Sequence, residues 1–471
     1  MLFSSMFFLW VFLPIVLAGA FLLRKTRLVN VFLVLASLLF YAWGEPVNVL
    51  LMLASVLINY LAGVLLSKYD DGGRRRLVLT ADIVLNLALL VWFKYLGLLA
   101  EGLNALLAPF GAGPVAVPQV PLPIGISFFT FQAMSYVIDV YRRKVEPQRK
   151  FLNVALYISF FPQLIAGPIV RYREINDQIE RRSVSMDDFA TGARRFIYGL
   201  GKKVLIANVM AQGADALFEL KVGNVTGGMA WLAAILYTFQ IYYDFSGYSD
   251  MAIGLGRMFG FHFSENFNYP YISRSIREFW RRWHISLSTW FKEYVYIPLV
   301  GNRKGTGRTY LNLLIVFALT GIWHGAGITF LLWGLYHGAL SILERLGLDK
   351  LLKKLGPFAF LYAFVAAVFG WVLFRVEDVN TALQWMGHML TPWAFTETTC
   401  HMVDIITPQI CALLPAAALG MGPLRLLADR LGLTERWRFS WPEVLYCAGL
   451  LFVCIATLTS ASYNPFIYFR F

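Results

Sequence analysis

Long apolar runs recur along the chain and are separated by short polar stretches. A helix that crosses a membrane needs about 20 mostly apolar residues. Clear runs of this kind lie at 3–23, 28–44, 46–67, 77–100, 310–340, 357–376, 405–422 and 441–460. Less uniform runs lie at 122–141, 151–170, 189–218 and 228–261. The pattern therefore predicts an all-α polytopic membrane protein with about 10–12 membrane helices, and we expect residues 1–471 to form one membrane domain.

Positive charges between the first runs predict how these runs are oriented. The loops at 24–27, 68–76 and 142–150 are basic, whereas the connections at 44–46 and 101–121 contain no Lys or Arg. Basic loops stay on the cytosolic side of a membrane. We therefore place the N-terminus outside and the three basic loops inside.

The run at 151–170 breaks this alternation because both of its flanks are basic. Pro162 and Pro168 would also interrupt a helix here. Irregular backbone at membrane depth survives only where protein or a cavity covers it. We interpret this run as a segment that enters and returns on the same side, beside a functional site. A plain helix with a proline kink is the alternative.

The stretch at 271–308 is too charged to cross a membrane. Trp280, Trp283 and Trp290 recur at helical spacing among several arginines. This pattern predicts an amphipathic helix that lies at the cytosolic interface of the membrane. The following loop, Gly301 to Arg308, is basic and rich in glycine, so it could contact phosphates, although a flexible turn is the simpler interpretation.

Composition agrees with a membrane protein, since 58% of the residues are hydrophobic and only 15% are charged. A soluble domain carries about 25% charged residues. The net charge of +13 lies in short loops, which favours contact with membrane lipids over nucleic acid. Four cysteines (Cys400, Cys411, Cys447 and Cys454) have no metal-binding or redox spacing. We expect them to fill helices, and we predict no metal site and no tightly bound cofactor.

His324 is the strongest candidate for chemistry. It lies inside the apolar run at 310–340, in the sequence Leu-Thr-Gly-Ile-Trp-His-Gly-Ala-Gly. Small neighbours let another backbone or a thin ligand arm approach, and a neutral imidazole in a partly dry pocket suits a general base. For a lone histidine, a hydrogen bond to a neighbouring helix is the simpler interpretation.

Two further histidines have weaker support. His284 lies in the basic stretch between Trp283 and Ile285, where a surface histidine among arginines is the simpler interpretation. His337 follows His324 by thirteen positions and falls on another helix face, so we interpret it as a packing residue.

Polar side chains also interrupt the run at 228–261. Asp244 and Tyr248 are four residues apart and share a helix face, and Asp250 follows them. Polar residues of the same kind occupy the runs at 122–141 and 151–170, namely Gln132 and Gln163. Buried polar groups need partners. Hydrogen bonds between helices are the simplest interpretation, and a direct role in catalysis or along the substrate path is the alternative.

Several motifs together resemble the membrane-bound O-acyltransferase family, and within it the bacterial branch that acetylates alginate. The resemblance covers nearly the whole chain. The motifs are Phe40-Tyr-Ala-Trp43, Pro123-Ile-Gly-Ile-Ser-Phe-Phe-Thr-Phe-Gln132, Phe161-Pro-Gln-Leu-Ile-Ala-Gly-Pro168, Tyr243-Asp-Phe-Ser-Gly-Tyr-Ser-Asp250, Phe279-Trp-Arg-Arg-Trp-His-Ile-Ser-Leu-Ser288, Gly321-Ile-Trp-His-Gly325 and Asn464-Pro-Phe-Ile-Tyr-Phe-Arg-Phe471. No single motif is specific for the family, but the occurrence of all of them in the same order is.

The resemblance implies a multi-pass enzyme of the bacterial inner membrane. It identifies His324 as the catalytic histidine and His284 as the second histidine. It also implies tilted helices around a funnel that narrows to a tunnel at His324. Acetyl-CoA or another thioester carrier would arrive from the cytosol, and an extracytoplasmic partner protein related to esterases would complete transfer to a polysaccharide.

Roles for nearby residues follow from this resemblance. Trp323 and Trp283 would line the tunnel, and three cations would meet the phosphates of the donor, namely Arg281, Arg282 and Lys292. A transporter or channel is an alternative function, because buried acids and histidines beside Gly and Pro breaks also mark transport pathways. A non-catalytic scaffold for an extracellular acetyltransferase is another.

Overall fold

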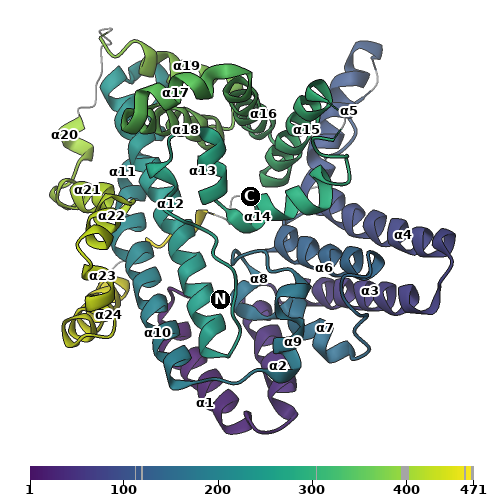
Figure 1. The fold of residues 1–471 in the computed structure, drawn as a ribbon. Coiled ribbons are helices and arrows are strands. Elements are labelled where there is room, and N and C mark those ends of the chain that lie inside the picture. Colours follow the sequence, from purple (N-terminus) through teal and green to yellow (C-terminus); the bar gives the residue numbers. More distant parts are fainter. Residues whose placement is uncertain (112, 118–119, 304, 394–401, 461–462, 468–471) are drawn as a thin grey trace. The chain divides into compact units, whose positions relative to one another are not determined.

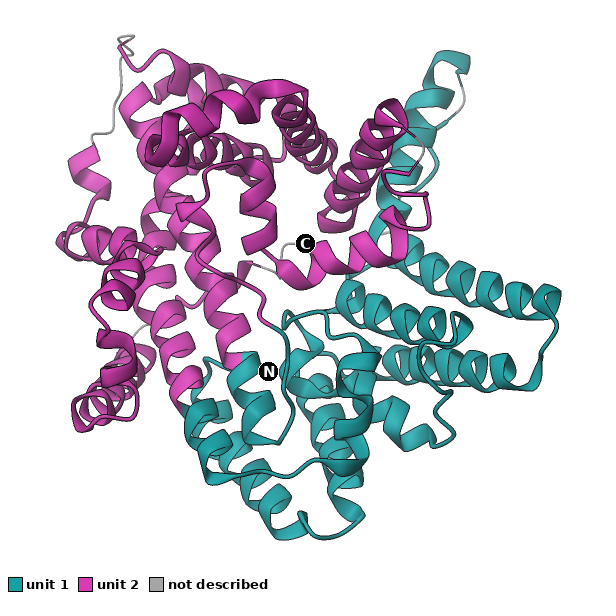
Figure 2. Cartoon of the chain, viewed as in Figure 1, with its two compact units in different colours: residues 1–193, 252–264 teal, residues 194–251, 265–471 magenta. Residues whose placement is uncertain are grey.

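The computed structural model describes residues 1–111, 113–117, 120–303, 305–393, 402–460 and 463–467. Within these residues the chain forms helices and no strand (Figure 1). This confirms the predicted all-α class. The chain divides into two compact units: residues 1–193 with 252–264, and residues 194–251 with 265–471 (Figure 2).

Among its described residues, unit 1 contains nine α-helices that lie wholly within it. They are α1 (Leu13–Leu23), α2 (Leu28–Ala42), α3 (Asn48–Lys68), α4 (Gly72–Leu90), α5 (Leu96–Leu107), α6 (Ile126–Tyr141), α7 (Phe151–Ser159), α8 (Phe161–Leu164) and α9 (Tyr172–Arg181). Two helices contribute residues to both units: α10 (Met186–Gly201) and α12 (Gly227–Met258). Phenylalanine rings from α2 and α8 form part of the core of unit 1, with Phe40 and Phe161 5.4 Å apart.

Unit 2 contains the remaining helices. They are α11 (Asn208–Phe218), α13 (Ile276–Arg282), α14 (Ile285–Phe291), α15 (Thr306–His324), α16 (Ile328–Leu343), α17 (Asp349–Leu355), α18 (Ala359–Arg375), α19 (Val379–Leu390), α20 (Met402–Ile405), α21 (Pro408–Gly420), α22 (Pro423–Arg430), α23 (Leu433–Trp437) and α24 (Trp441–Ser460). Its core draws apolar side chains from α11, α12, α13, α16, α18, α19 and α21.

Length and composition identify four stretches of the described chain that can cross a membrane. They are Asn48–Lys68, Gly72–Phe110, Ile328–Arg375 and Trp441–Ser460. A fifth would be α21 and α22 taken together, which meet at a bend of 52°. The other predicted runs form helices that are shorter, broken or more polar, including the apolar helical stretches Phe8–Leu23 and Leu28–Ala42.

The predicted interruption at 151–170 is confirmed. α7 ends at Ser159, α8 is a single turn, and the chain from Ile165 to Arg171 is not helical. The break falls before Pro162, at Phe160, whose ψ of 113° is not helical. The alternative of a continuous helix with a proline kink is therefore wrong. Because residues 153–170 are all buried, the irregular backbone is covered by protein, as membrane depth requires.

Candidate active site

The run at 310–340 is not one helix, and this prediction is wrong. α15 ends at His324, Gly325 to Gly327 make the turn, and α16 returns beside α15 as an antiparallel partner (Figure 1). Gly325 is fully extended, with φ −161° and ψ 159°, and it ends the helix. The apolar pattern continues through the turn because both helices are apolar. As a result, His324 is the last residue of a helix.

Two glycines allow this close helix pairing. A Cβ on Gly321 would lie 2.2 Å from the main-chain oxygen of Phe330, and a Cβ on Gly334 would lie 2.2 Å from that of Phe317. The backbones of α15 and α16 touch at these positions. The small residues around His324 therefore serve helix packing, which fixes the last turn of α15.

The stretch at 271–308 was predicted as one amphipathic helix, and this is also wrong. It forms two short helices, α13 and α14, which are broken at His284. His284 has φ 43° and ψ 55°, a left-handed conformation that costs a residue with a Cβ roughly 1–2 kcal/mol. The stretch is amphipathic as predicted, since Trp280, Trp283 and Trp290 are buried. The break turns His284 into the protein, where it is 0% exposed.

Asn266 determines which ring nitrogen of His284 carries the proton. Asn266 Oδ1 lies 3.2 Å from the main-chain N–H of Ser286, which can only donate, so this atom is an acceptor. His284 Nδ1 lies 3.1 Å from the same oxygen and must therefore be the N–H. Asn266 Nδ2 donates to Ser249 Oγ at 3.0 Å, which fits this orientation. His284 is thus held with its lone pair on Nε2.

His284 is neutral over the physiological range. Burial lowers its pKa from 6.5 to about 3, because the imidazolium loses its hydration. Its ring meets the edge of Phe245 with centroids 4.7 Å apart. An imidazole in this state accepts a hydrogen bond at Nε2 but is a poor proton reservoir near pH 7.

His324 lies beside His284 inside unit 2, and their ring centroids are 6.3 Å apart. His324 is 3% exposed. Aromatic rings pack around it, with centroid distances of 4.9 Å to Trp323, 5.1 Å to Trp333 and 5.2 Å to Phe374. The structure therefore brings together two histidines that lie forty positions apart, within apolar surroundings that strengthen hydrogen bonds and exclude bulk water.

Asp244 and Tyr248 face the C-terminal segment of the chain. Asp244 pairs with the buried Lys203 at 2.9 Å and accepts the main-chain N–H of Ile467 at 2.8 Å. Lys203 also donates to the main-chain oxygen of Pro465. The ring of Tyr248 packs on Phe466 at 4.8 Å. These contacts support the simpler interpretation, in which the two residues join separate parts of the chain.

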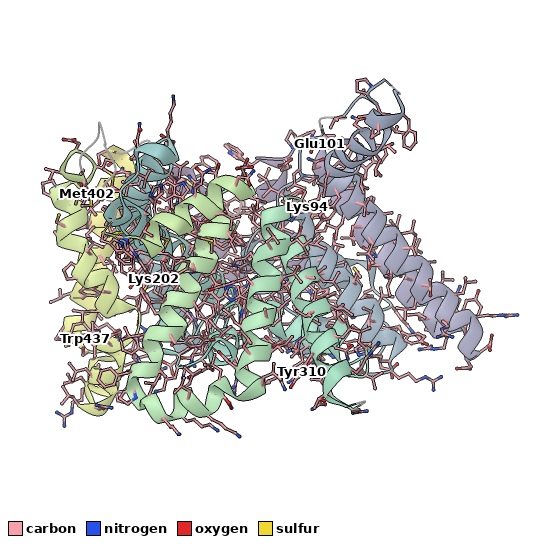
Figure 3. The ribbon with its side chains drawn as sticks, turned by 90° about the horizontal axis from the view of Figure 1, so that it is seen from above. Lys94, Glu101, Lys202, Tyr310, Met402 and Trp437 are labelled. Carbon is pink, nitrogen blue, oxygen red and sulfur yellow. The ribbon has the colours of Figure 1, made fainter. Side chains whose placement is uncertain are left out.

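Asp250 is held by two cations of unit 2. Arg195 donates to it at 2.8 Å and Lys202, labelled in Figure 3, at 2.6 Å. Arg195 also pairs with Glu265. This network ties α12 to α10 and to the π-helical stretch Lys202–Ala207 that follows it. It leaves Asp250 engaged with these cations and not with the histidine pair.

Gln132 and Gln163 both belong to unit 1 and lie near Tyr157. The Gln163 side chain donates to the main-chain oxygen of Tyr157, which belongs to the last turns of α7. The Tyr157 hydroxyl lies 3.0 Å from the main-chain oxygen of Gln132. Both glutamines are fully buried. The Gln163 side chain therefore supports the irregular segment after α7, which agrees with a helix-joining role. Gln132 contributes its main-chain oxygen, and neither polar atom of its side chain has a partner among the described residues.

Trp283 and Trp323 differ in their distance from the histidine pair. Trp323 contacts both rings, since it lies 4.9 Å from His324 and 6.1 Å from His284. Trp283 instead packs in the aromatic core, stacked on Phe279 at 5.6 Å and 4.8 Å from Trp371.

The three predicted phosphate-binding cations lie on the surface of α13 and just after α14. Arg282 is neutralised by Glu278 at 2.9 Å, and Arg281 donates to a main-chain oxygen of its own helix. Lys292 is exposed.

Three contributing residues were not identified from the sequence. Asn266 and Lys203 lie far along the chain from the residues that they contact, His284 and Asp244. Trp333 lies on α16, across the turn from His324, and one tryptophan in an apolar run does not mark a site. Cys447 and Cys454 are buried as apolar fillers, Cys411 is exposed, and Cys400 lies outside the described residues. Among the described residues, no group of three His, Cys, Asp or Glu side chains could hold a metal ion.

Several known proteins are similar to this chain, two of them over most of its length. The sequence pattern of the membrane-bound O-acyltransferase family matches residues 39–353. The probable alginate O-acetylase AlgI of Pseudomonas putida is 42% identical over 100% of both chains. The peptidoglycan O-acetyltransferase of Helicobacter pylori is 36% identical over 83% of this chain and 80% of its own. The teichoic acid D-alanyltransferase of Bacillus subtilis is 29% identical over 46% of this chain and 57% of its own.

Proposed function

The chain belongs to the membrane-bound O-acyltransferase family and is a multi-pass O-acyltransferase, and from this premise we propose that it moves an acetyl group from a cytosolic thioester to a polysaccharide outside a bacterial inner membrane. The names of its relatives support this proposal, since two of them acetylate alginate or peptidoglycan. The third carries a different acyl group, D-alanine, to teichoic acid and matches over about half of this chain.

One observation carries the proposal: the buried pair of His324 and His284, whose ring centroids are 6.3 Å apart. A structural histidine would need only one helix partner. Here a strained backbone and the side chain of Asn266 orient the second imidazole toward the same space. A strained backbone persists only where the surrounding structure holds it, and such residues cluster at functional sites.

The reaction needs one proton acceptor at the attacking hydroxyl. His324, in its neutral form, takes the proton while the hydroxyl oxygen attacks the thioester carbonyl carbon. The C–S bond then breaks, and the imidazolium returns the proton to the leaving thiolate. The products are an ester and a free thiol, so atoms and charge balance. General-base assistance of this kind contributes about 10²–10⁴-fold in rate.

His284 would act as an orienting acceptor. With the proton on Nδ1, its Nε2 lone pair can receive a hydrogen bond from the hydroxyl or from the imidazole of His324. Its low pKa keeps it from competing for the transferred proton. The aromatic rings around His324 would keep water from the thioester, whose hydrolysis is the competing reaction.

The acceptor is a hydroxyl of an extracytoplasmic polysaccharide, and alginate is the first candidate because the AlgI relative covers the entire chain. An esterase-like partner outside the membrane would receive the acetyl group or present the glycan. The chain itself would supply the passage across the membrane.

Purified protein in lipid nanodiscs tests the proposal directly. Acetyl-labelled acetyl-CoA is added with alginate oligosaccharides, and the label in the glycan and the free thiol are both measured. We expect both to appear together in the wild-type protein. Flux of an ion or a sugar in vesicles without thioester loss would instead support a transporter.

A further inference from the structure

An acidic side chain lies buried within a membrane-crossing stretch of unit 1. Asp82 belongs to α4, in the stretch Gly72–Phe110 that is long and apolar enough to cross a membrane. Only 11% of the most apolar window of this stretch is buried, yet Asp82 is 2% exposed. α3 and α6 pack on α4, so the acid is covered by protein and not by lipid. An ionisable group in such a place is costly and points to a function.

The carboxyl group of Asp82 has no hydrogen-bond partner at either oxygen among the described residues. Arg75, seven positions earlier on the same helix, is also buried, but its guanidinium donates to main-chain oxygens at the ends of α3 and α6. Arg75 is therefore engaged elsewhere. An unpaired carboxylate is more costly to bury than a paired one, so the structure calls for a partner at this position.

Asn86, one turn after Asp82, has no N–H group left for the carboxyl beside it. Its Nδ2 donates to the main-chain oxygen of Asp82 at 2.9 Å and to Oδ1 of Asn59 at 3.3 Å. Asn59 of α3 uses its Nδ2 in the same way, with the main-chain oxygen of Ser55 at 2.8 Å and Oδ1 of Asn86 at 3.2 Å. Main-chain oxygens can only accept, so the orientation of both amides is settled.

The groups that remain at this place are acceptors. Each amide oxygen accepts one hydrogen bond and keeps a second lone pair, and the two carboxylate oxygens are unoccupied. Asn59 is 0% exposed and Asn86 is 1% exposed. A buried group of oxygens without a donor attracts a cation. One monovalent cation balances the charge of one carboxylate, whereas a divalent ion would leave a net charge in apolar surroundings.

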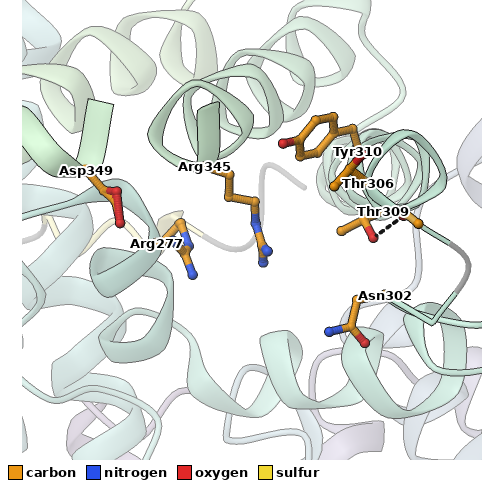
Figure 4. Close-up of a pocket in the computed structure, with 8 residues that line it drawn as sticks. Arg277, Asn302, Thr306, Thr309, Tyr310, Arg345 and Asp349 are labelled. Atoms are coloured by element: carbon orange, nitrogen blue, oxygen red, sulfur yellow. Dashed lines mark hydrogen bonds between the residues drawn. The ribbon is translucent and has the colours of Figure 1, made fainter. Parts of the chain in front are cut away.

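The charged side chains around a pocket of unit 2 differ from Asp82 in their surroundings. Arg277, Arg345 and Asp349 line an open pocket of about 420 Å³ (Figure 4), and Arg345 is exposed. Groups that are open to water keep their hydration and need no protein partner. Asp82 has no such access, so its partner must lie inside the protein.

We infer that Asp82, Asn86 and Asn59 bind a sodium ion between α3 and α4. Small hard cations take carboxylate and amide oxygens as ligands, and one ion serves several of these oxygens at once. A proton on Asp82 would serve one of them. The spacing of histidines and cysteines does not reveal such a site, because its ligands are an acid and two amides. The site belongs to unit 1 and the histidine pair to unit 2, so sodium binding is a property separate from the proposed acyl transfer.

Thermal unfolding of the full chain in lipid nanodiscs tests the site. The unfolding temperature is compared in sodium chloride and in choline chloride of equal ionic strength. A ligand that binds the folded state raises this temperature, and we expect a rise of about 2–4 °C in sodium that saturates with concentration. Equal unfolding temperatures in the two salts contradict the inference.

Asp82→Asn removes the charge and keeps the shape of the side chain. The variant should lose the sodium-dependent rise, and it should be at least as stable as the wild type in choline because it removes an unpaired charge. Glu101→Gln, at an exposed acid of α5 labelled in Figure 3, is the matched loss of charge and should keep the sodium response. A sodium response that survives in Asp82→Asn overturns the role of this carboxyl.

Chemical labelling of the wild-type chain gives a second readout that needs no variant. Dicyclohexylcarbodiimide enters membranes and reacts with protonated carboxyl groups, and mass spectrometry of peptides reports the modified residue. Sodium held at Asp82 excludes the proton that the reagent needs, so sodium at ten times its dissociation constant should slow labelling of Asp82 about tenfold relative to choline. Equal labelling in the two salts would mean that a proton or a buried water fills the site, and would overturn the inference.

Asn59→Leu tests the amide ligands. The variant removes one amide oxygen and leaves the carboxyl of Asp82 in place. The sodium concentration that gives half of the stabilisation should rise several-fold, while labelling of Asp82 in choline persists. An unchanged sodium dependence would contradict the place of Asn59 among the ligands. These readouts do not require acyl transfer, so a failure of the proposed function and a failure of this site are distinguishable.

Discussion

The burial and the tautomer of His284 are determined by the residues around it. Its sequence context, a basic stretch, favoured a surface histidine. The left-handed backbone that turns it inward and the Asn266 side chain that fixes its tautomer both depend on residues distant in sequence. By contrast, His324 could be singled out because an imidazole inside an apolar run is costly in itself. The sequence therefore identifies a functional residue when the cost of burying its side chain is evident from its immediate neighbours.

The pH dependence of the reaction distinguishes the two histidines. Burial lowers the pKa of His284 to about 3, so acidification from pH 8 to pH 5 leaves it neutral. Any acid limb of kcat/KM in this range must therefore report a group other than His284. We expect His284→Gln to reduce the rate while the midpoint of the acid limb stays unchanged. A midpoint that moves or disappears in this variant would mean that His284 is the proton acceptor.

Asn266 should act through His284. Asn266→Ala removes the acceptor of the Nδ1 proton, and the imidazole is then free to rotate or to change tautomer. Loss of a group that orients a functional histidine costs on the order of 10–100-fold at metal sites, and we expect a rate loss of that size with normal folding. The assay is thioester turnover in nanodiscs. Full activity in Asn266→Ala would show that orientation of His284 is unimportant, and Lys354→Gln provides an exposed control on α17.

At the level of helices, the apolar runs predicted well that helices form but predicted poorly where each helix begins and ends. α2, α3, α18 and α24 lie where the runs predicted them. The hairpin of α15 and α16 was missed because its turn is short and apolar, and periodicity alone does not reveal a change of direction. The break between α13 and α14 was missed for a related reason, since it falls at a histidine between two tryptophan-rich turns.

The contact between α15 and α16 makes a prediction about stability. Gly334→Ala places a Cβ 2.2 Å from a main-chain oxygen, which cannot move without shifting the helix. Overpacking of this kind costs about 1–3 kcal/mol, and displacement of α15 would also misplace His324. We expect a lower unfolding temperature together with reduced activity. Gly449→Ala on α24, where a Cβ meets nothing within 4 Å, should be neutral or slightly stabilising. Equal behaviour of the two variants would refute the packing argument.

At the level of the whole chain, the two compact units share no simple border in the sequence, since residues 252–264 group with the N-terminal part. No composition shift marks this division. The C-terminal segment joins unit 2 through polar contacts with Lys203 and Asp244. Asp244 was identified as a buried acid in need of a partner, but its partner could not be predicted because lysines are numerous and the fold decides which one is near.

The buried pair of Lys203 and Asp244 should hold the C-terminal segment in place. Asp244→Asn leaves the Lys203 ammonium buried beside a neutral amide, and removal of one member of a buried ion pair costs about 3–5 kcal/mol. We expect a lower unfolding temperature and faster proteolysis of the C-terminal segment. The double variant Lys203→Met with Asp244→Leu should recover much of the stability, because it leaves no unpaired charge. If the single and double variants are equally unstable, the ion pair is not the cause.

In the proposed mechanism, acyl transfer requires the imidazole at position 324. The most direct measurement is the rate at which the glycan is acetylated by cells whose only copy of the protein carries His324→Gln, with the amount of folded protein in the membrane confirmed to equal the wild type. We predict that acetylation falls to background in this variant and persists at a reduced rate in His284→Gln. Wild-type acetylation in the His324→Gln cells would reduce the protein to a scaffold and contradict the account.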